Sequence, residues 1–151
     1  MIPEAPPASL HDNRGNSGEA TLIHWQEHYL IGHPRIDFEH RIFFDLIVSY
    51  HEARVGGAPP DKLLRILEEI VLYAKFHFKS EENMMQDLGY PGLDEHKALH
   101  MRLTEGLGTK VSAVRLGRHQ PMDVEAFLVE WFIDHVTHED TKVSEFVRAT
   151  H

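Results

Sequence analysis

Residues 60–88 carry the longest helical pattern in the chain, and its apolar stripe contains two polar side chains that can bind a metal. The stripe repeats at three- and four-residue intervals, as on one face of an α-helix. Its members are Leu63, Ile66, Leu67, Ile70, Tyr73, Ala74, His77, Glu81, Met84 and Leu88. Burying a polar side chain without a partner costs about 1–3 kcal/mol. The pattern therefore predicts that His77 and Glu81 meet a shared partner in the core, such as a metal ion.

Three further helical patterns accompany this one. The first spans about residues 36–54, with Asp37 as the expected N-cap, the next begins near Leu93, and the last begins near Met122. Beyond His135 the apolar stripe continues one residue late, which predicts a wide turn such as a π-bulge. Four amphipathic helices with short connections predict an all-α fold, an up-down-up-down four-helix bundle.

The N-terminal region differs from the rest of the chain. Residues 1–20 are rich in Pro, Gly, Ser and Asn, which predicts a flexible tail ahead of a bundle domain over residues 21–151. Gly32 and Pro34 interrupt any regular element, so an irregular arm is expected before the first helix. The tail lacks the apolar stretch of a secretory signal, and we expect a cytoplasmic protein.

Composition narrows the classes of function. The 151 residues include 13 histidines and no cysteine, so a metal site would use nitrogen and oxygen ligands. The formal net charge is -9 and no basic cluster is present, which argues against nucleic acid as a partner. No run of 18 apolar residues occurs, and we expect no membrane span.

Seven side chains that can bind metals come from all four helices and lie at or near the apolar faces. They are His40, His77, Glu81, His96, His100, His135 and Asp140. Five imidazoles and two carboxylates exceed the needs of one ion with an open position, and they suit two six-coordinate ions bridged by the carboxylates. The nitrogen-rich set favours iron over magnesium or calcium.

Two assignments stay open at this point. Glu139 is a rival of Asp140, because it lies four residues after His135, which is the regular helical spacing. His51 shares a face with His40, so it is either a partner of the metal ligands or a partly buried surface histidine.

Four segments of the chain resemble the hemerythrins, in particular the bacterial ones. They occur in the order and at the spacings of that family: W-x3-Y-x-I-G-x4-D-x-E-H from Trp25 to His40, HFxxEExxM from His77 to Met85, EHxxxH from Glu95 to His100, and WFxxHxxxxD from Trp131 to Asp140. The tripeptide GYP follows the second segment. The resemblance covers about residues 22–147.

The resemblance implies a pair of iron ions with a bridging oxo or hydroxo group. One ion is expected to be bound by His96, His100 and His135, the other by His40 and His77, with Glu81 and Asp140 bridging both. The second ion is then one ligand short, and this open position is expected to take O2. The walls of the O2 pocket are expected to be Phe78, Trp131, Phe132 and Val136.

The function implied is reversible O2 binding, for storage, transport or delivery, by a protein that is not an enzyme. One alternative is an O2 or redox sensor that acts through a separate protein partner. Another is a di-iron enzyme such as a peroxidase or nitric oxide reductase. Because imidazole must lose its proton to bind iron, metal affinity is expected to fall with pH through the histidine range near pH 6 to 6.5.

Overall fold

The computed structural model describes residues 24–150 of the chain. Its helices are α1 (Pro34–Val55), α2 (Pro60–Leu88), α3 (Leu93–Arg115), α4 (Pro121–Asp134) and α5 (Asp140–Thr150). A short 3-10 turn, Glu27–Tyr29, precedes α1, and a π-helical turn, His135–Glu139, joins α4 to α5. No strand occurs within the described residues. The tail predicted for residues 1–20 lies outside them.

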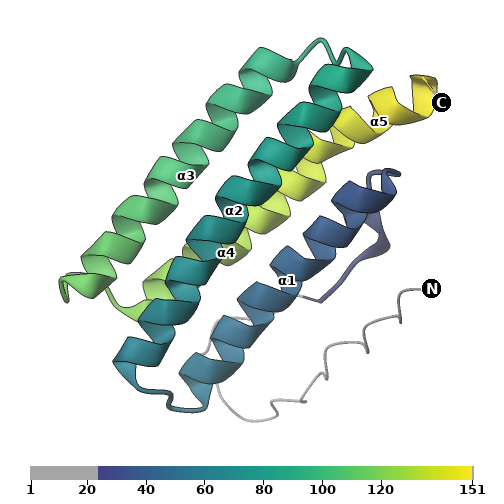
Figure 1. Cartoon of the computed structure of the whole chain (residues 1–151). Coiled ribbons are helices and arrows are strands. Elements are labelled where there is room, and N and C mark those ends of the chain that lie inside the picture. Colours follow the sequence, from purple (N-terminus) through teal and green to yellow (C-terminus); the bar gives the residue numbers. More distant parts are fainter. Residues whose placement is uncertain (1–23, 151) are drawn as a thin grey trace.

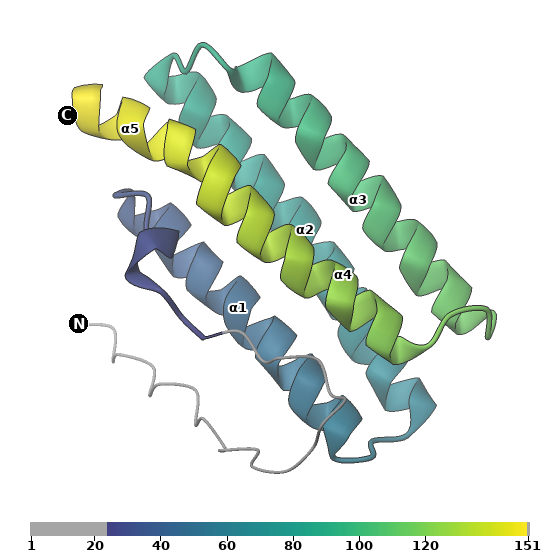
Figure 2. The same cartoon turned by 180° about the vertical axis from the view of Figure 1, so that it is seen from behind.

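The helices form the predicted bundle. α4, the π-helical turn and α5 continue one another as a single rod, which packs beside α1 and α3, while α2 packs beside α1 and α3 from the other side (Figures 1 and 2). Successive rods run in opposite directions. The all-α, up-down-up-down prediction is therefore confirmed. None of the helices within residues 24–150 is both long and apolar enough to cross a bilayer.

The start of α1 differs from the prediction. The helix begins at Pro34, not Ile36, because proline at the first helical position lacks only an N–H group that would have no helical partner there. His33 is the N-cap, and its Nδ1 accepts a hydrogen bond from the Ile36 amide at 3.4 Å. The prediction of Asp37 as N-cap is wrong: its carboxylate accepts from the amides of Ile31, at 2.6 Å, and Gly32. Asp37 thereby fixes the arm to the first turn of α1.

The core consists of two apolar clusters with a polar layer between them. The larger cluster includes Phe43, Phe78 and Val136, and the smaller includes Met84 and Val143. Along α2 and along the α4–α5 rod, the metal-capable residues fall between members of the two clusters. Apolar packing therefore closes both ends of the polar layer to water.

Candidate metal centre

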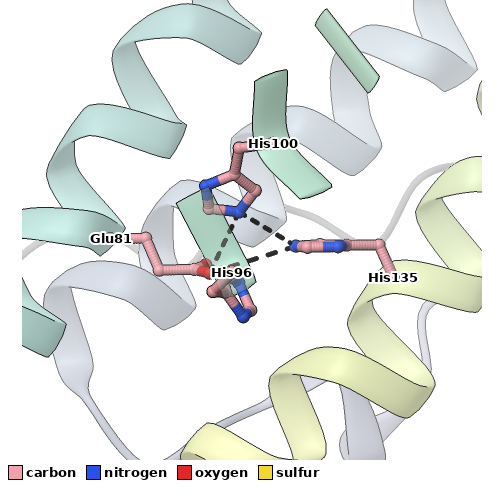
Figure 3. Close-up of side chains that lie close together, drawn as sticks. All are labelled: Glu81, His96, His100 and His135. Atoms are coloured by element: carbon pink, nitrogen blue, oxygen red, sulfur yellow. Dashed lines mark hydrogen bonds and ion pairs between the residues drawn. The ribbon is translucent and has the colours of Figure 1, made fainter. Parts of the chain in front are cut away.

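The seven metal-capable side chains meet in this layer, and each is almost fully buried. Glu81 and Asp140 have no exposed surface, and the five histidines are 1–4% exposed. Figure 3 shows His96, His100 and His135 converging on the Glu81 carboxylate from α3 and from the end of α4. The structure thus brings together all seven residues that the sequence singled out.

The two oxygens of Glu81 face different groups of histidines. Oε1 lies near the Nε2 atoms of three of them: His96 at 2.7 Å, His100 at 3.4 Å and His135 at 3.9 Å. Oε2 lies near the Nε2 atoms of the other two: His77 at 3.3 Å and His40 at 3.5 Å. One carboxylate therefore separates a three-histidine group from a two-histidine group.

Asp140 repeats this division from the opposite side. Its Oδ1 lies 3.1 Å from His135 Nε2 and 3.4 Å from His96 Nε2, in the three-histidine group. Its Oδ2 lies 3.1 Å from His40 Nε2, in the two-histidine group. Each carboxylate consequently offers one oxygen to each group of imidazoles.

The π-helical turn explains how Asp140 reaches this position. In a regular helix, five residues from His135 would rotate Asp140 far from the histidine. The wider turn over His135–Glu139 removes that offset, so the predicted distortion is confirmed. Glu139 instead lies toward the surface, with Oε2 3.4 Å from Lys142 Nζ. The structure thus favours Asp140 over its rival.

Three of the histidines donate a hydrogen bond through Nδ1, the ring nitrogen that does not face the two carboxylates. His77 Nδ1 is 2.9 Å from Glu39 Oε1, His100 Nδ1 is 2.8 Å from Glu82 Oε2, and His40 Nδ1 is 3.2 Å from the Tyr29 carbonyl oxygen. Each contact places a proton on Nδ1, so in the neutral imidazole the lone pair is on Nε2, which faces the layer. Such outer partners orient imidazoles that bind metals and raise their basicity.

Glu39 is a functional candidate that the sequence analysis did not assign. It is 4% exposed, and Oε2 accepts hydrogen bonds from Ser80 Oγ at 2.7 Å and from Arg35 Nε at 3.2 Å. Burial raises the pKa of its carboxyl group, but the hydrogen bonds from His77 and Ser80 outweigh burial and lower it. A local signal existed, since Glu39 is three residues after Ile36 and therefore lies beside the apolar stripe of α1.

Glu39→Gln is expected to weaken metal binding by about 10–100-fold, the usual cost of losing an outer partner of a ligand histidine. The amide keeps the size of the side chain and removes its charge. The matched control is Arg35→Gln, because the Arg35 side chain is 67% exposed and reaches Glu39 only from the surface. Titration with ferrous iron against a chelator measures both affinities. Equal affinities for the two variants would show that Glu39 has no such role.

His51 does not contact the metal-capable group. Its Nδ1 lies 3.0 Å from Glu125 Oε1, and Arg54 Nη2 lies 2.9 Å from Glu125 Oε2. Glu125 is 1% exposed. The suggestion that His51 is a partner of the ligands is wrong, because a buried carboxylate at the start of α4 binds it instead. This cluster ties the end of α1 to α4, and the hydroxyl of Tyr50 adds a bond to the Pro121 carbonyl.

The residues expected to wall the O2 pocket are all buried beside the histidines. Phe78 stacks on His100 with 4.0 Å between ring centroids, and Trp131 stacks on His135 at 5.8 Å. Phe132 approaches His40 edge-on at 6.5 Å. Val136 is 3% exposed and belongs to the larger apolar cluster. Two of these aromatic side chains thus pack against the three-histidine group, and Phe132 packs against the two-histidine group.

The carboxylates change the acidity of the imidazoles strongly. Burial lowers the pKa of His40, but Asp140 and Glu81 outweigh burial and raise it to about 10. Burial likewise lowers the pKa of His96, and the same two carboxylates raise it to about 10. Burial raises the pKa of Glu81, yet hydrogen bonds from surrounding histidines hold it well below its ordinary value. Without metal, protons therefore occupy this layer well above the pH range expected for free histidine.

Several polar atoms of the layer have no hydrogen-bond partner among the described residues. They are Glu81 Oε2, His40 Nε2 and both carboxylate oxygens of Asp140. Buried polar atoms are satisfied in the great majority of native structures. Five Nε2 atoms and four carboxylate oxygens that point at one another are the donors that a transition metal binds. Two overlapping sets within 4.8 Å meet this requirement: Glu81, His96, His100 and His135, and His40, His77 and Glu81.

A family model supports the same interpretation. The model of the hemerythrin HHE cation binding domain matches residues 32–147. The chain belongs to the hemerythrin family. This family membership confirms the resemblance inferred from the sequence motifs.

Curated relatives of this hemerythrin cover most of its length. It is 25% identical over 128 residues to the bacteriohemerythrin of Stenotrophomonas maltophilia, with 85% of this chain and 83% of the relative covered. It is 27% identical over 122 residues to that of Clostridium acetobutylicum, covering 77% and 94%. The hemerythrin subunit alpha of Lingula anatina is 28% identical over 118 residues, covering 78% and 89%. These relatives are named as hemerythrins and not as enzymes, in agreement with the prediction of a binding protein.

Solved structures show the same fold. A crystal structure of a substituted hemerythrin superimposes with a TM-score of 0.75 at 24% sequence identity, over 83% of this chain and 97% of that one. Another substituted variant gives the same TM-score at 25% identity, over 83% and 97%. The hemerythrin bundle is therefore the fold of residues 24–150.

Proposed function

We propose that this hemerythrin binds dioxygen reversibly at a non-haem di-iron centre. One iron would be held by His96, His100 and His135, the other by His40 and His77, with Glu81 and Asp140 bridging the two. An oxo or hydroxo group would complete the bridge. The hemerythrin names of the relatives and the donor set of this chain both support the proposal.

The observation that carries the proposal is the division of carboxylate oxygens between the two groups of histidines. Glu81 directs one oxygen toward three imidazoles and the other toward two. Asp140 directs one oxygen toward two of the same three imidazoles, those of His96 and His135, and the other toward His40 in the two-histidine group. A single ion would have no use for two such groups, whereas a pair of ions bridged by carboxylates uses all of them. The three-and-two division also leaves the ion of the two-histidine group with fewer protein ligands.

Two ferrous ions would supply the electrons that hold O2, and the surrounding chain would keep the site dry. Phe132 packs edge-on against both His40 and Tyr29, with the Tyr29 ring centroid 5.3 Å away. Phe43 lies 6.2 Å from the ring of His77. These side chains exclude water beside the two-histidine group, and exclusion of water opposes side reactions such as oxidation of the empty site. Phe78, Trp131 and Val136 would give the same protection on the three-histidine side.

The proposal predicts that the purified protein binds two irons per chain. The reduced protein is expected to be nearly colourless, to gain a visible charge-transfer band on exposure to O2, and to lose that band when O2 is removed. Metal analysis and absorption spectra over repeated oxygenation cycles test this. Copper or zinc in place of iron, or one ion per chain, would contradict the proposal. Steady consumption of O2 or peroxide without return of the reduced spectrum would favour the enzyme alternative.

A further inference from the structure

A groove on the surface of the bundle leads to one of the metal-capable histidines. It lies between α3 and α4, which run side by side in Figure 2, and has a volume of about 560 Å³. Its apolar wall includes Leu99, Leu103 and Phe127, and Trp131 and His135 also line it. Because His135 Nε2 is 3.1 Å from Asp140 Oδ1, the His135 imidazole stands between the groove and the buried carboxylates.

The groove also carries polar groups that bind cations. Glu130, Asp134, His138 and Glu139 line it together with the residues above. Within residues 24–150, neither Glu130 nor Asp134 forms an ion pair, and the ion-pair partner of Glu139 is the exposed Lys142. His138 Nδ1 donates to the Asp134 carbonyl at 3.2 Å, which leaves its Nε2 lone pair available. Carboxylate and imidazole are suitable ligands for a ferrous ion.

His135 differs from three of the other histidines in its hydrogen bonding at Nδ1. His40, His77 and His100 each have a hydrogen bond at Nδ1, whereas His135 Nδ1 is buried and has no partner among the described residues. His135 also begins the π-helical turn, where the regular i to i+4 bonding of the helix is interrupted. Turning its imidazole would consequently break no hydrogen bond at Nδ1.

We infer that this groove is the uptake route for ferrous iron, in which Glu130, Asp134, His138 and Glu139 hold the ion transiently before His135 admits it. The inference rests on the proposed di-iron function and adds a second, weaker cation site to it. A negatively charged groove raises the local concentration of cations and their rate of association. His135, whose Nδ1 has no hydrogen-bond partner among the described residues, then provides the moving ligand between the groove and the carboxylates of Glu81 and Asp140.

The test compares two triple variants with the same change in net charge. Glu130→Gln, Asp134→Asn and Glu139→Gln remove three negative charges from the groove. The control, Glu52→Gln, Glu69→Gln and Asp87→Asn, removes three from exposed positions of α1 and α2 that do not line it. Metal-free protein is mixed anaerobically with ferrous iron, and aliquots are quenched with a colorimetric ferrous chelator. The quenched samples give the time course of uptake, and a metal assay after long incubation gives the final iron per chain.

The groove variant is expected to take up iron at least about tenfold more slowly than wild type at low salt, and the control at nearly the wild-type rate. Both should reach the wild-type iron content, and the difference should shrink at about 1 M salt, where screening is strong. Equal rates in the two variants, whether both slow or both fast, would overturn the inference. If wild type itself retains no iron after long incubation, the proposed function fails and the inference fails with it. A variant that takes up iron slowly but reaches the full iron content has a defect in the route to the centre and not in the centre itself.

Discussion

Glu81→Ala is expected to abolish binding of both irons, a larger loss than the roughly 10–100-fold expected for an outer partner such as Glu39. Glu81 is the residue shared by both metal-capable sets. Its removal takes one oxygen from each group of histidines, and among the described residues it leaves Asp140 as the one carboxylate that faces the Nε2 atoms of both groups. Metal analysis after loading and gel filtration, together with the absorption spectrum in air, measures the result.

The control for this variant is Glu125→Gln, because Glu125 is almost as deeply buried. It lies on α4 and contacts His51 and Arg54 near the C-terminal end of α1, away from the metal-capable residues. Disrupting a buried charged pair costs about 3–5 kcal/mol of stability. Glu125→Gln is therefore expected to lower the melting temperature while still binding two irons. Circular dichroism of metal-free Glu81→Ala verifies that it remains helical. Two irons in folded Glu81→Ala would contradict the bridging role of Glu81.

Much of the fold and the inward direction of the site residues could be predicted because both depend on local periodicity. The bounds of α2 match the prediction, since Pro60 begins the helix and Gly89, at φ 70°, ends it in a left-handed conformation that glycine adopts easily. Likewise, His77 and Glu81 point inward because a spacing of four places them on one helical face. The phase slip after His135 was local too, and it corresponds to the π-helical turn.

Contacts between helices could not be predicted in the same way. Periodicity says which face a residue lies on, but it does not say which residue of another helix it meets. The pair Glu39–His77 is separated by 38 residues and the pair His51–Glu125 by 74, so neither follows from a local pattern. The error at Asp37 has a similar cause. Aspartate is a preferred N-cap, but here a hydrogen bond to the arm occupies its carboxylate.

The melting temperatures of iron-loaded and metal-free protein are expected to depend on pH differently. In the metal-free protein the carboxylates raise the pKa of His40 and His96 from 6.5 to about 10. A raised pKa stabilises the fold fully below the unfolded value near 6.5, and this contribution is lost as pH rises toward 10. Glu81 and Asp140 have lowered pKa values, so their contribution is lost only in acid, below their ordinary values of 4.5 and 3.8. The metal-free melting temperature is therefore expected to fall between about pH 7 and pH 10.

Iron binding displaces those protons, so its affinity should increase over the same range and not only above pH 6 to 6.5. Because a ligand stabilises the state that it binds, the gap between the melting temperatures of loaded and metal-free protein should widen as pH rises. Anaerobic calorimetry with and without chelator measures both curves. Asp140→Asn removes one carboxylate beside His40 and His96 and should flatten the metal-free curve, whereas His119→Gln, in the exposed loop before α4, should leave its slope unchanged. Parallel curves for loaded and metal-free wild type would show that protons and iron do not compete for these imidazoles.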